Sequence, residues 1–135
     1  MAGTGLDIQD GLAMALATIP GLRVADHLPE QINPPIAVIQ IQSVTYHRAM
    51  RGGLSTWEYV VSVVAGRLGD RSAQRTLDAW MSWDGPQSVR AALEQDPTLG
   101  GVSSTVKVND MLAVRPVSLG DAAYLSCEFN VTVNA

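Results

Sequence analysis

Residues 123–133 alternate strictly between apolar and polar side chains, and this pattern constrains the fold more than any other in the chain. A period of two is typical of a β-strand that buries one face and leaves the other in water. The face toward the core would carry Leu125, Cys127, Phe129, Val131 and Val133. Because antiparallel sheets can leave one face solvated, the pattern predicts that this strand belongs to an antiparallel sheet.

A second long strand is predicted at residues 55–65, and its later half is apolar on both faces. One face would carry Trp57, Tyr59, Val61, Val63 and Ala65. The other face carries Val60 and Val64. A strand whose second face was in water would carry polar residues at these positions. This strand is therefore predicted either to lie centrally in the sheet or to meet something outside the core with its second face.

Three helices are predicted from the spacing of apolar residues. The first runs from a cap at Thr4 to Pro20, and the second begins at Asp70 or Ser72. The third begins with Pro86 at its first position and ends before Pro97. The apolar stripes of these helices are Ile8, Leu12, Ala15, Leu16 and Ile19; Ala73, Leu77, Trp80 and Met81; and Val89, Ala92 and Leu93.

The remaining strands complete an α+β fold. They are predicted at residues 22–26, 36–46 and 102–117, the last with a break near Asn109 and Asp110. The element order is then α-β-β-β-α-α-β-β, a mostly antiparallel sheet with an N-terminal helix and a mid-chain helical pair. Because strands follow one another as hairpins, this order differs from that of a doubly wound parallel fold.

Length and composition predict one soluble, intracellular domain spanning residues 1–135. A single cysteine, Cys127, excludes an intrachain disulfide framework. The net charge of −4 argues against a general nucleic-acid binder, because neutralising phosphates requires a basic surplus. No apolar run approaches the length of a membrane span.

No motif predicts a catalytic, cofactor or metal site. Gly66 to Gly69 precedes a helix but lacks the lysine and the spacing of a phosphate-binding loop, so a turn is favoured. Cys127 is predicted to be a buried apolar residue and not a nucleophile. The polar candidates His27, His47, Glu58 and Asp110 lie in separate segments, and no spacing brings them together.

Surface contacts with other subunits are the more promising kind of site. The segment that holds Tyr46, Arg48, Met50 and Arg51 is rich in residue types that protein interfaces favour, although a solvated hairpin tip fits it equally well. Trp80 and Trp83 are too closely spaced for both to enter a small core without one approaching the surface, and packing in the core is favoured for these tryptophans over a role as an interface anchor. The candidate interface residues are Tyr46, Arg48, Met50, Arg51, Val60, Val64, Arg71, Arg75 and Trp83. For Arg75, local pairing with Asp78 is the alternative.

The whole chain resembles one known family. The proline pair Pro34-Pro35 leads into the strand Ile36-Ala37-Val38-Ile39, and the Tyr46 and Arg48 loop and the strand from Trp57 to Val63 follow. With the segment from Ser72 to Trp80, this layout resembles the tail terminator (minor tail protein U-like) proteins of long-tailed bacteriophages. The resemblance implies a structural virion protein without enzymatic activity or cofactors.

The resemblance also implies partners. A protein of this kind forms a homohexameric ring at the head-proximal end of the tail, contacts the major tail tube protein, and offers a docking surface to the neck or head-completion protein. It is assembled in the host cytoplasm, and genomic DNA passes through its bore without sequence-specific binding. Two alternatives stay open: another head–tail connector or neck protein, and a small cytoplasmic α+β ligand-binding domain.

Overall fold

Five strands and three helices make up the described part of the computed structural model, which covers residues 5–25, 35–46, 55–67, 69, 71–96, 98–99, 101, 105–119 and 122–134. The elements are α1 (Gly5–Leu16), β1 (Arg23–Ala25), β2 (Ile36–Thr45), β3 (Thr56–Arg67), α2 (Arg71–Met81), α3 (Val89–Glu94), β4 (Thr105–Leu119) and β5 (Ala122–Asn134). The fold is mixed α+β, as the sequence predicts, and the described elements follow the predicted order.

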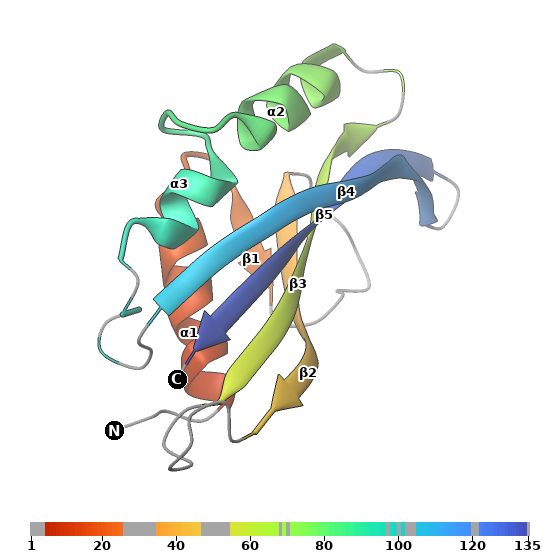
Figure 1. The fold of residues 1–135 in the computed structure, drawn as a ribbon. Coiled ribbons are helices and arrows are strands. Elements are labelled where there is room, and N and C mark those ends of the chain that lie inside the picture. The colour runs from red at the N-terminus through yellow and green to blue at the C-terminus, as the bar shows by residue number, and fades with distance from the viewer. Residues whose placement is uncertain are drawn as a thin grey trace.

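The strands form one twisted sheet with the order β1-β2-β3-β5-β4 (Figure 1). Every neighbouring pair is antiparallel except β1 and β2, which are parallel over three residues each. β3 lies between β2 and β5, which is the central position offered by the first of the two alternatives predicted for it. The two sheet edges are formed by the short β1 and the long β4.

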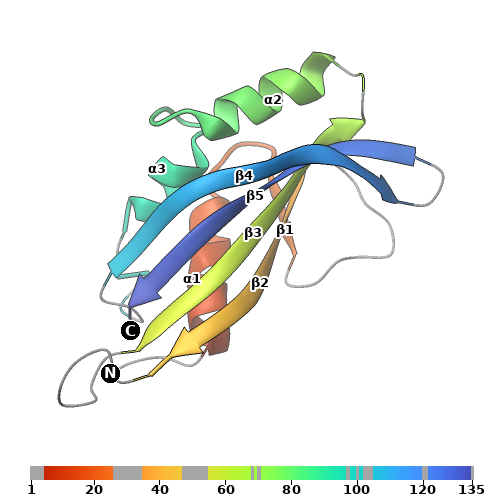
Figure 2. The ribbon, with the colours of Figure 1, turned by 45° about the vertical axis from the view of Figure 1, so that its right-hand side comes forward.

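The described helices lie against one face of the sheet, and the core fills the space between (Figure 2). Its strand side is formed by the alternating residues that the sequence indicates, including Val61, Val63, Cys127, Phe129 and Val131. Its helix side is formed by Ile8, Leu12, Leu16, Ile19, Ala73, Leu77, Trp80, Val89, Ala92 and Leu93. These buried apolar side chains belong to a single cluster.

Helix α1 ends at Leu16 and does not continue to Pro20 as predicted. The chain leaves the helix through tight turns, because the amide of Thr18 bonds to the carbonyl of Ala15 and the amide of Ile19 to that of Leu16. The Thr18 hydroxyl also donates to the Ala15 carbonyl, at 2.7 Å. Such three-residue spacing tightens the chain at a helix end, while Ile19 still reaches the core.

Helix α3 begins at Val89, so the prediction that Pro86 occupies its first position is wrong. Ser88 is the N-cap: its backbone is extended, and its hydroxyl accepts a hydrogen bond from the Ala91 amide at 3.1 Å. A serine side chain satisfies one of the free amides of the first turn in this way, which a proline cannot do. Pro86 lies in the turn before the cap.

Register shifts occur in β2, β3 and β4, and those in β3 and β4 bear on the predicted strands. The predicted break near Asn109 and Asp110 is a bulge between Val108 and Asp110, and β4 continues through it to Leu119. β3 runs two residues beyond its predicted end, with a register shift between Val64 and Gly66. Such shifts add a residue to one strand and increase the local twist, and the alternating pattern does not reveal them.

Candidate assembly surface

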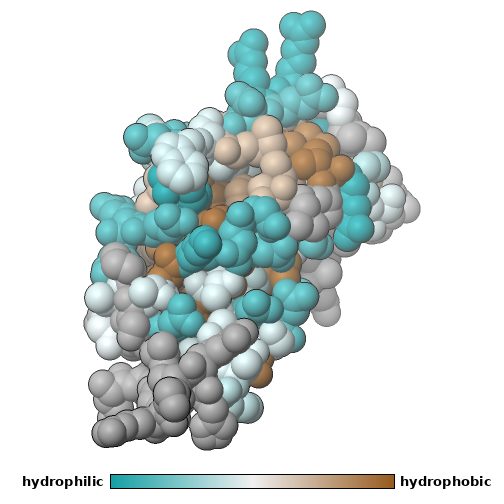
Figure 3. Space-filling view, in the orientation of Figure 1, coloured by the Kyte–Doolittle hydropathy of each residue, from teal (hydrophilic) through white to brown (hydrophobic). Residues whose placement is uncertain are grey.

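Several large apolar side chains are exposed on the molecule. Figure 3 shows apolar atoms open to the surface below hydrophilic side chains that project past α2. The exposed residues are Met14, Ile41, Tyr46, Met81, Trp83 and Val114. Tyr46 and Trp83 were predicted as interface residues from the sequence. Trp83 is the largest of the set and is 75% exposed.

The two neighbouring tryptophans take opposite positions. Trp80 is 1% exposed and fills the core beneath α2, whereas Trp83 lies in the turn that follows the helix. Met81 was predicted to share the buried stripe but is exposed, because the last turn of α2 places Trp80 toward the sheet and Met81 away from it. The sequence predicted that one tryptophan would approach the surface, and Trp83 is that residue.

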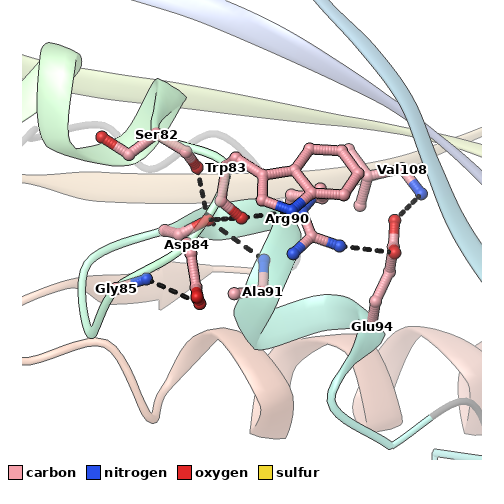
Figure 4. A network of polar contacts seen from close by, with 9 residues as sticks. Ser82, Trp83, Asp84, Gly85, Arg90, Ala91, Glu94 and Val108 are labelled. Atoms are coloured by element: carbon pink, nitrogen blue, oxygen red, sulfur yellow. Dashed lines mark hydrogen bonds and ion pairs between the residues drawn. The ribbon is translucent and has the colours of Figure 1, made fainter.

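The indole of Trp83 lies over the guanidinium of Arg90, with 3.7 Å between Cζ and the ring centroid (Figure 4). Such a contact between a cation and an aromatic face is stabilising even at the surface. Arg90 comes from α3, so the contact joins the turn to the next helix. One face of the indole is therefore supported by the protein, and the ring is held in a defined orientation.

The backbone of the turn is fixed as well. The Ser88 hydroxyl donates to the Ser82 carbonyl at 2.6 Å and also approaches the Trp83 carbonyl at 3.3 Å. Arg90 Nε donates to the same Trp83 carbonyl at 2.8 Å. Both groups bind the backbone carbonyl of Trp83. They therefore fix the position of this residue in the turn whatever side chain it carries.

A chain of polar contacts then connects this turn to the sheet. Arg90 pairs with Glu94 at 2.8 Å, and the second carboxylate oxygen of Glu94 accepts the Val108 amide at 3.0 Å (Figure 4). Trp83 is thus presented on a framework tied to β4. Sequence reasoning missed Ser88, Arg90 and Glu94, although the four-residue spacing of the last two is a recognised helix-surface pair.

The other candidate interface residues do not form one patch with Trp83. Arg71 and Arg75 are exposed on α2, and Tyr46 follows the end of β2. The two ion pairs among the described residues are Arg90–Glu94 and Arg115–Glu128, so the local pairing of Arg75 with Asp78 is not one of them. Arg48, Met50 and Arg51 lie outside the described residues.

Val60 and Val64 lie on the sheet face without helices, as predicted, but offer little free surface. Val64 is 6% exposed and Val60 is half-buried. Val64 lines a small hollow of about 180 Å³ together with Val38 and Arg115. Val64 is therefore buried largely by its own chain. The alternating pattern alone could not distinguish this burial from burial by a partner.

Cross-strand polar contacts cover much of this helix-free face. Glu58 and Asp110, which no spacing could bring together, line one polar hollow of about 290 Å³. Both are engaged by neighbours: Ser43 donates to Glu58 at 3.2 Å, and the Asn130 amide donates to Asp110 at 2.7 Å. His27 and His47 lie outside the described residues, within which no three potential metal ligands cluster.

The Cys127 thiol and the Tyr59 phenol are buried, and their raised pKa values keep both protonated at neutral pH. Burial, with the nearby Glu128 carboxylate adding to it, raises the pKa of the Cys127 thiol to about 12. Burial also raises the pKa of Tyr59 to about 12. Since the thiolate is the nucleophilic form, Cys127 is poorly suited to catalysis at neutral pH. The buried position predicted for Cys127 is confirmed.

The described helices give no indication of a membrane span, since none is long and apolar enough to cross a bilayer. Among the surface features described above, the most distinctive is the Trp83 turn, which comprises residues 82–88 and is supported by Arg90 and Glu94. No protein-family model matches the chain, and no curated protein matches it.

Proposed function

We propose that this protein is the tail terminator of a long-tailed bacteriophage, a structural virion protein that acts as a ring. Six copies would cap the head-proximal end of the tail tube and stop its polymerisation. The same ring would then provide the surface on which the neck of the capsid docks. The resemblance in element order and proline-led strand entry suggests this role, and the geometry of the surface supports it.

The observation that carries the proposal is the rigid presentation of Trp83. An indole that is 75% exposed gains little from its own chain, yet the Ser88 hydroxyl and Arg90 hold the backbone of the turn that carries it, and the Arg90 guanidinium supports one face of the ring. Tryptophan and arginine are enriched among the residues that dominate protein–protein binding. A fixed, exposed tryptophan is therefore expected in a subunit that works by association.

The charge of the chain supports the passage of DNA through such a ring. The net charge is −4, and the helix-free face carries the carboxylates Glu58, Asp110 and Glu128 against the cations Lys107 and Arg115. A surface without a basic surplus gains little from releasing the counterions of DNA. DNA would therefore meet no strongly attractive wall from this chain.

Tail length tests the proposal directly. In a phage that lacks this protein, we expect tail tubes longer than normal and without attached heads, measured by electron microscopy. Adding the purified protein to tubes during assembly should limit their length. Labelled protein should bind the head-proximal end of the finished tubes.

Other outcomes would assign a different role. Tails of normal length that fail to join heads would contradict termination and favour the alternative of another neck protein. Normal tails and normal joining, together with a small molecule bound to the purified protein, would favour a ligand-binding domain instead. Either result would remove the tail terminator from consideration.

A further inference from the structure

A second surface feature lies beside α2 and borders the Trp83 turn, whose Gln87 is part of its lining. It is a hollow of about 330 Å³ whose lining includes Pro20, Leu22, Pro35, Arg75, Ala79 and Trp80. Two prolines, a leucine and the edge of the buried Trp80 make much of this lining apolar. Arg75 brings a cation to it, and it forms no ion pair within the described part of the chain.

The side chain of Trp83 lies toward one edge of the sheet and most of the hollow toward the other, while Gln87 of the Trp83 turn reaches the hollow. The turn is tied through Arg90 and Glu94 to Val108 of β4, which forms one edge. The hollow includes Leu22, directly before β1, and Pro35, directly before β2, at the other edge. Figure 1 shows α3 beside β4, with β1 on the far side of the sheet order. Trp83 does not line the hollow of its own chain.

We propose that Trp83 of one copy inserts into this hollow on the next copy. The hollow offers what an indole needs: apolar walls of proline, leucine and tryptophan, and the Arg75 guanidinium as a cation for the electron-rich ring face. This inference rests on the proposed function only in assuming that the chain associates with itself.

The positions of the two features determine the kind of assembly. A projection on one side that fits a hollow on another side gives a heterologous, head-to-tail contact, and such contacts generate rings when the rotation closes. Because the Trp83 turn is already ordered by Ser88 and Arg90, little conformational freedom is lost when it binds. The outward-facing side of the indole would be covered by the partner, and Arg75 would gain an aromatic neighbour.

Two single substitutions of the full chain test the contact from its two sides. Trp83→Ala removes the projection but keeps the main-chain carbonyl that Ser88 and Arg90 bind. Ala79→Leu fills the hollow with a side chain that suits a helix. In sedimentation velocity, we expect the wild type to associate and each variant to sediment as a monomer, with circular dichroism unchanged.

Matched controls separate this contact from general surface effects. Met14→Ala removes an equally exposed apolar side chain from α1, and Gln74→Leu adds a leucine to α2 outside the hollow. Both controls should associate as the wild type does. Loss of association in either control to the same degree would overturn the assignment of the contact to Trp83 and the hollow.

Mixing the two variants provides the decisive measurement. The Trp83→Ala copy keeps an intact hollow and the Ala79→Leu copy keeps an intact Trp83, so an equimolar mixture should form a dimer of one copy of each. Native mass spectrometry distinguishes this dimer from either homodimer by its mass. A dimer is the largest species expected, because the remaining hollow is filled and the remaining projection is absent.

The outcomes separate this inference from the proposed function. A mixture that stays monomeric, a Trp83→Ala variant that still associates, or a wild type that is monomeric at the highest concentration reached would each overturn the contact. Tail-length control could survive any of those results through another interface. Conversely, a wild-type ring that depends on Trp83 but never limits tail length would retain the contact and refute the tail terminator.

Discussion

At the scale of single residues, the core face of β5 determines the chemistry of the only thiol. Cys127 is fully buried among apolar side chains, and its neighbour Glu128 carries a carboxylate. Burial and this negative charge both disfavour the thiolate, which is why the pKa rises to about 12. The thiol therefore behaves as a small apolar side chain at neutral pH.

Thiol reactivity should follow from this burial. We expect Cys127 to resist Ellman's reagent in the native protein and to react fully once denaturant exposes it, because reaction requires both access and thiolate. The absorbance of the released thiolate over time measures the rate in each state. Complete reaction of the native protein within the time of mixing would contradict the buried position.

Stability should also fall in alkali. Cys127 and Tyr59 have pKa values raised to about 12 in the folded state, so the unfolded chain loses these protons first. Their contribution is present below the unfolded pKa values and is lost as pH rises toward the folded ones. Urea unfolding from about pH 8 to about pH 11 should show a falling midpoint. Cys127→Ala should make that fall shallower, and an unchanged slope would contradict the role of Cys127.

At the scale of elements, the turn between α2 and α3 depends on one small side chain. Ser88 is 1% exposed, caps α3, and binds the carbonyls of Ser82 and Trp83. One hydroxyl thus holds both the start of a helix and the turn before it. The orientation of the Trp83 turn is therefore a property of the α3 cap.

Removing that hydroxyl should cost more than a surface change. We expect Ser88→Ala to lower the free energy of unfolding by about 1 to 2 kcal/mol, since the cap and the hydrogen bond to the Ser82 carbonyl are lost, while the Trp83 carbonyl keeps Arg90 Nε as its donor. Ser82→Ala is the control, because its exposed hydroxyl donates only to the Asp78 carbonyl, and it should change stability by less than about 0.5 kcal/mol. Chemical denaturation measures both. Equal effects would refute the special role of Ser88.

The outer edge of β4 is protected in several ways against pairing with foreign strands. The Val108 amide donates to Glu94, and Pro116 has no amide proton to offer a foreign strand. Two register shifts also interrupt the pairing of β4 with β5. Prolines, bulges and charged side chains are the means by which proteins protect exposed strand edges. Association through this strand edge is therefore disfavoured, which leaves side-chain contacts such as Trp83 as the route to assembly.

Glu94→Ala should open this edge locally. The Val108 amide would lose its acceptor, and we expect its hydrogen exchange, followed by NMR, to become faster. Glu94→Gln keeps a carbonyl oxygen that can accept the same bond, so its exchange should stay close to that of the wild type. Equal protection in both variants would show that the carboxylate does not shield the strand.

At the scale of the whole molecule, the sequence predicts the fold better than the surface. Alternation in 123–133 and the apolar second face of β3 predict the sheet and its centre, because burial repeats with the period of the element. Which tryptophan is exposed depends on how α2 rotates against the sheet, and the hollow exists only where α2 and the turn after it meet the segment before β1 and Pro35. Such features arise from contacts between distant segments, which local patterns do not record.

The shared core predicts one cooperative unfolding transition. All described helices and four of the strands contribute to a single buried cluster, so we expect far-ultraviolet circular dichroism and tryptophan fluorescence to change together with urea. Trp80 and the partly buried Trp57 report on the core and Trp83 on the surface, and the Trp83→Ala variant leaves only the two tryptophans that contact the core. Separate midpoints for the two methods would contradict a single folding unit.

The pairing of β3 with β5 has a consequence for how the chain is made in the cell. Thr56 and Asn134, which share a hydrogen bond of 2.8 Å, are 78 residues apart in the chain. During translation, β3 leaves the ribosome before β5 has been synthesised, so one edge of β3 stays unpaired while α2, α3 and β4 are made. Late pairing of this kind slows folding and favours aggregation, so nascent chains of this protein should depend on chaperones until residue 134 has emerged.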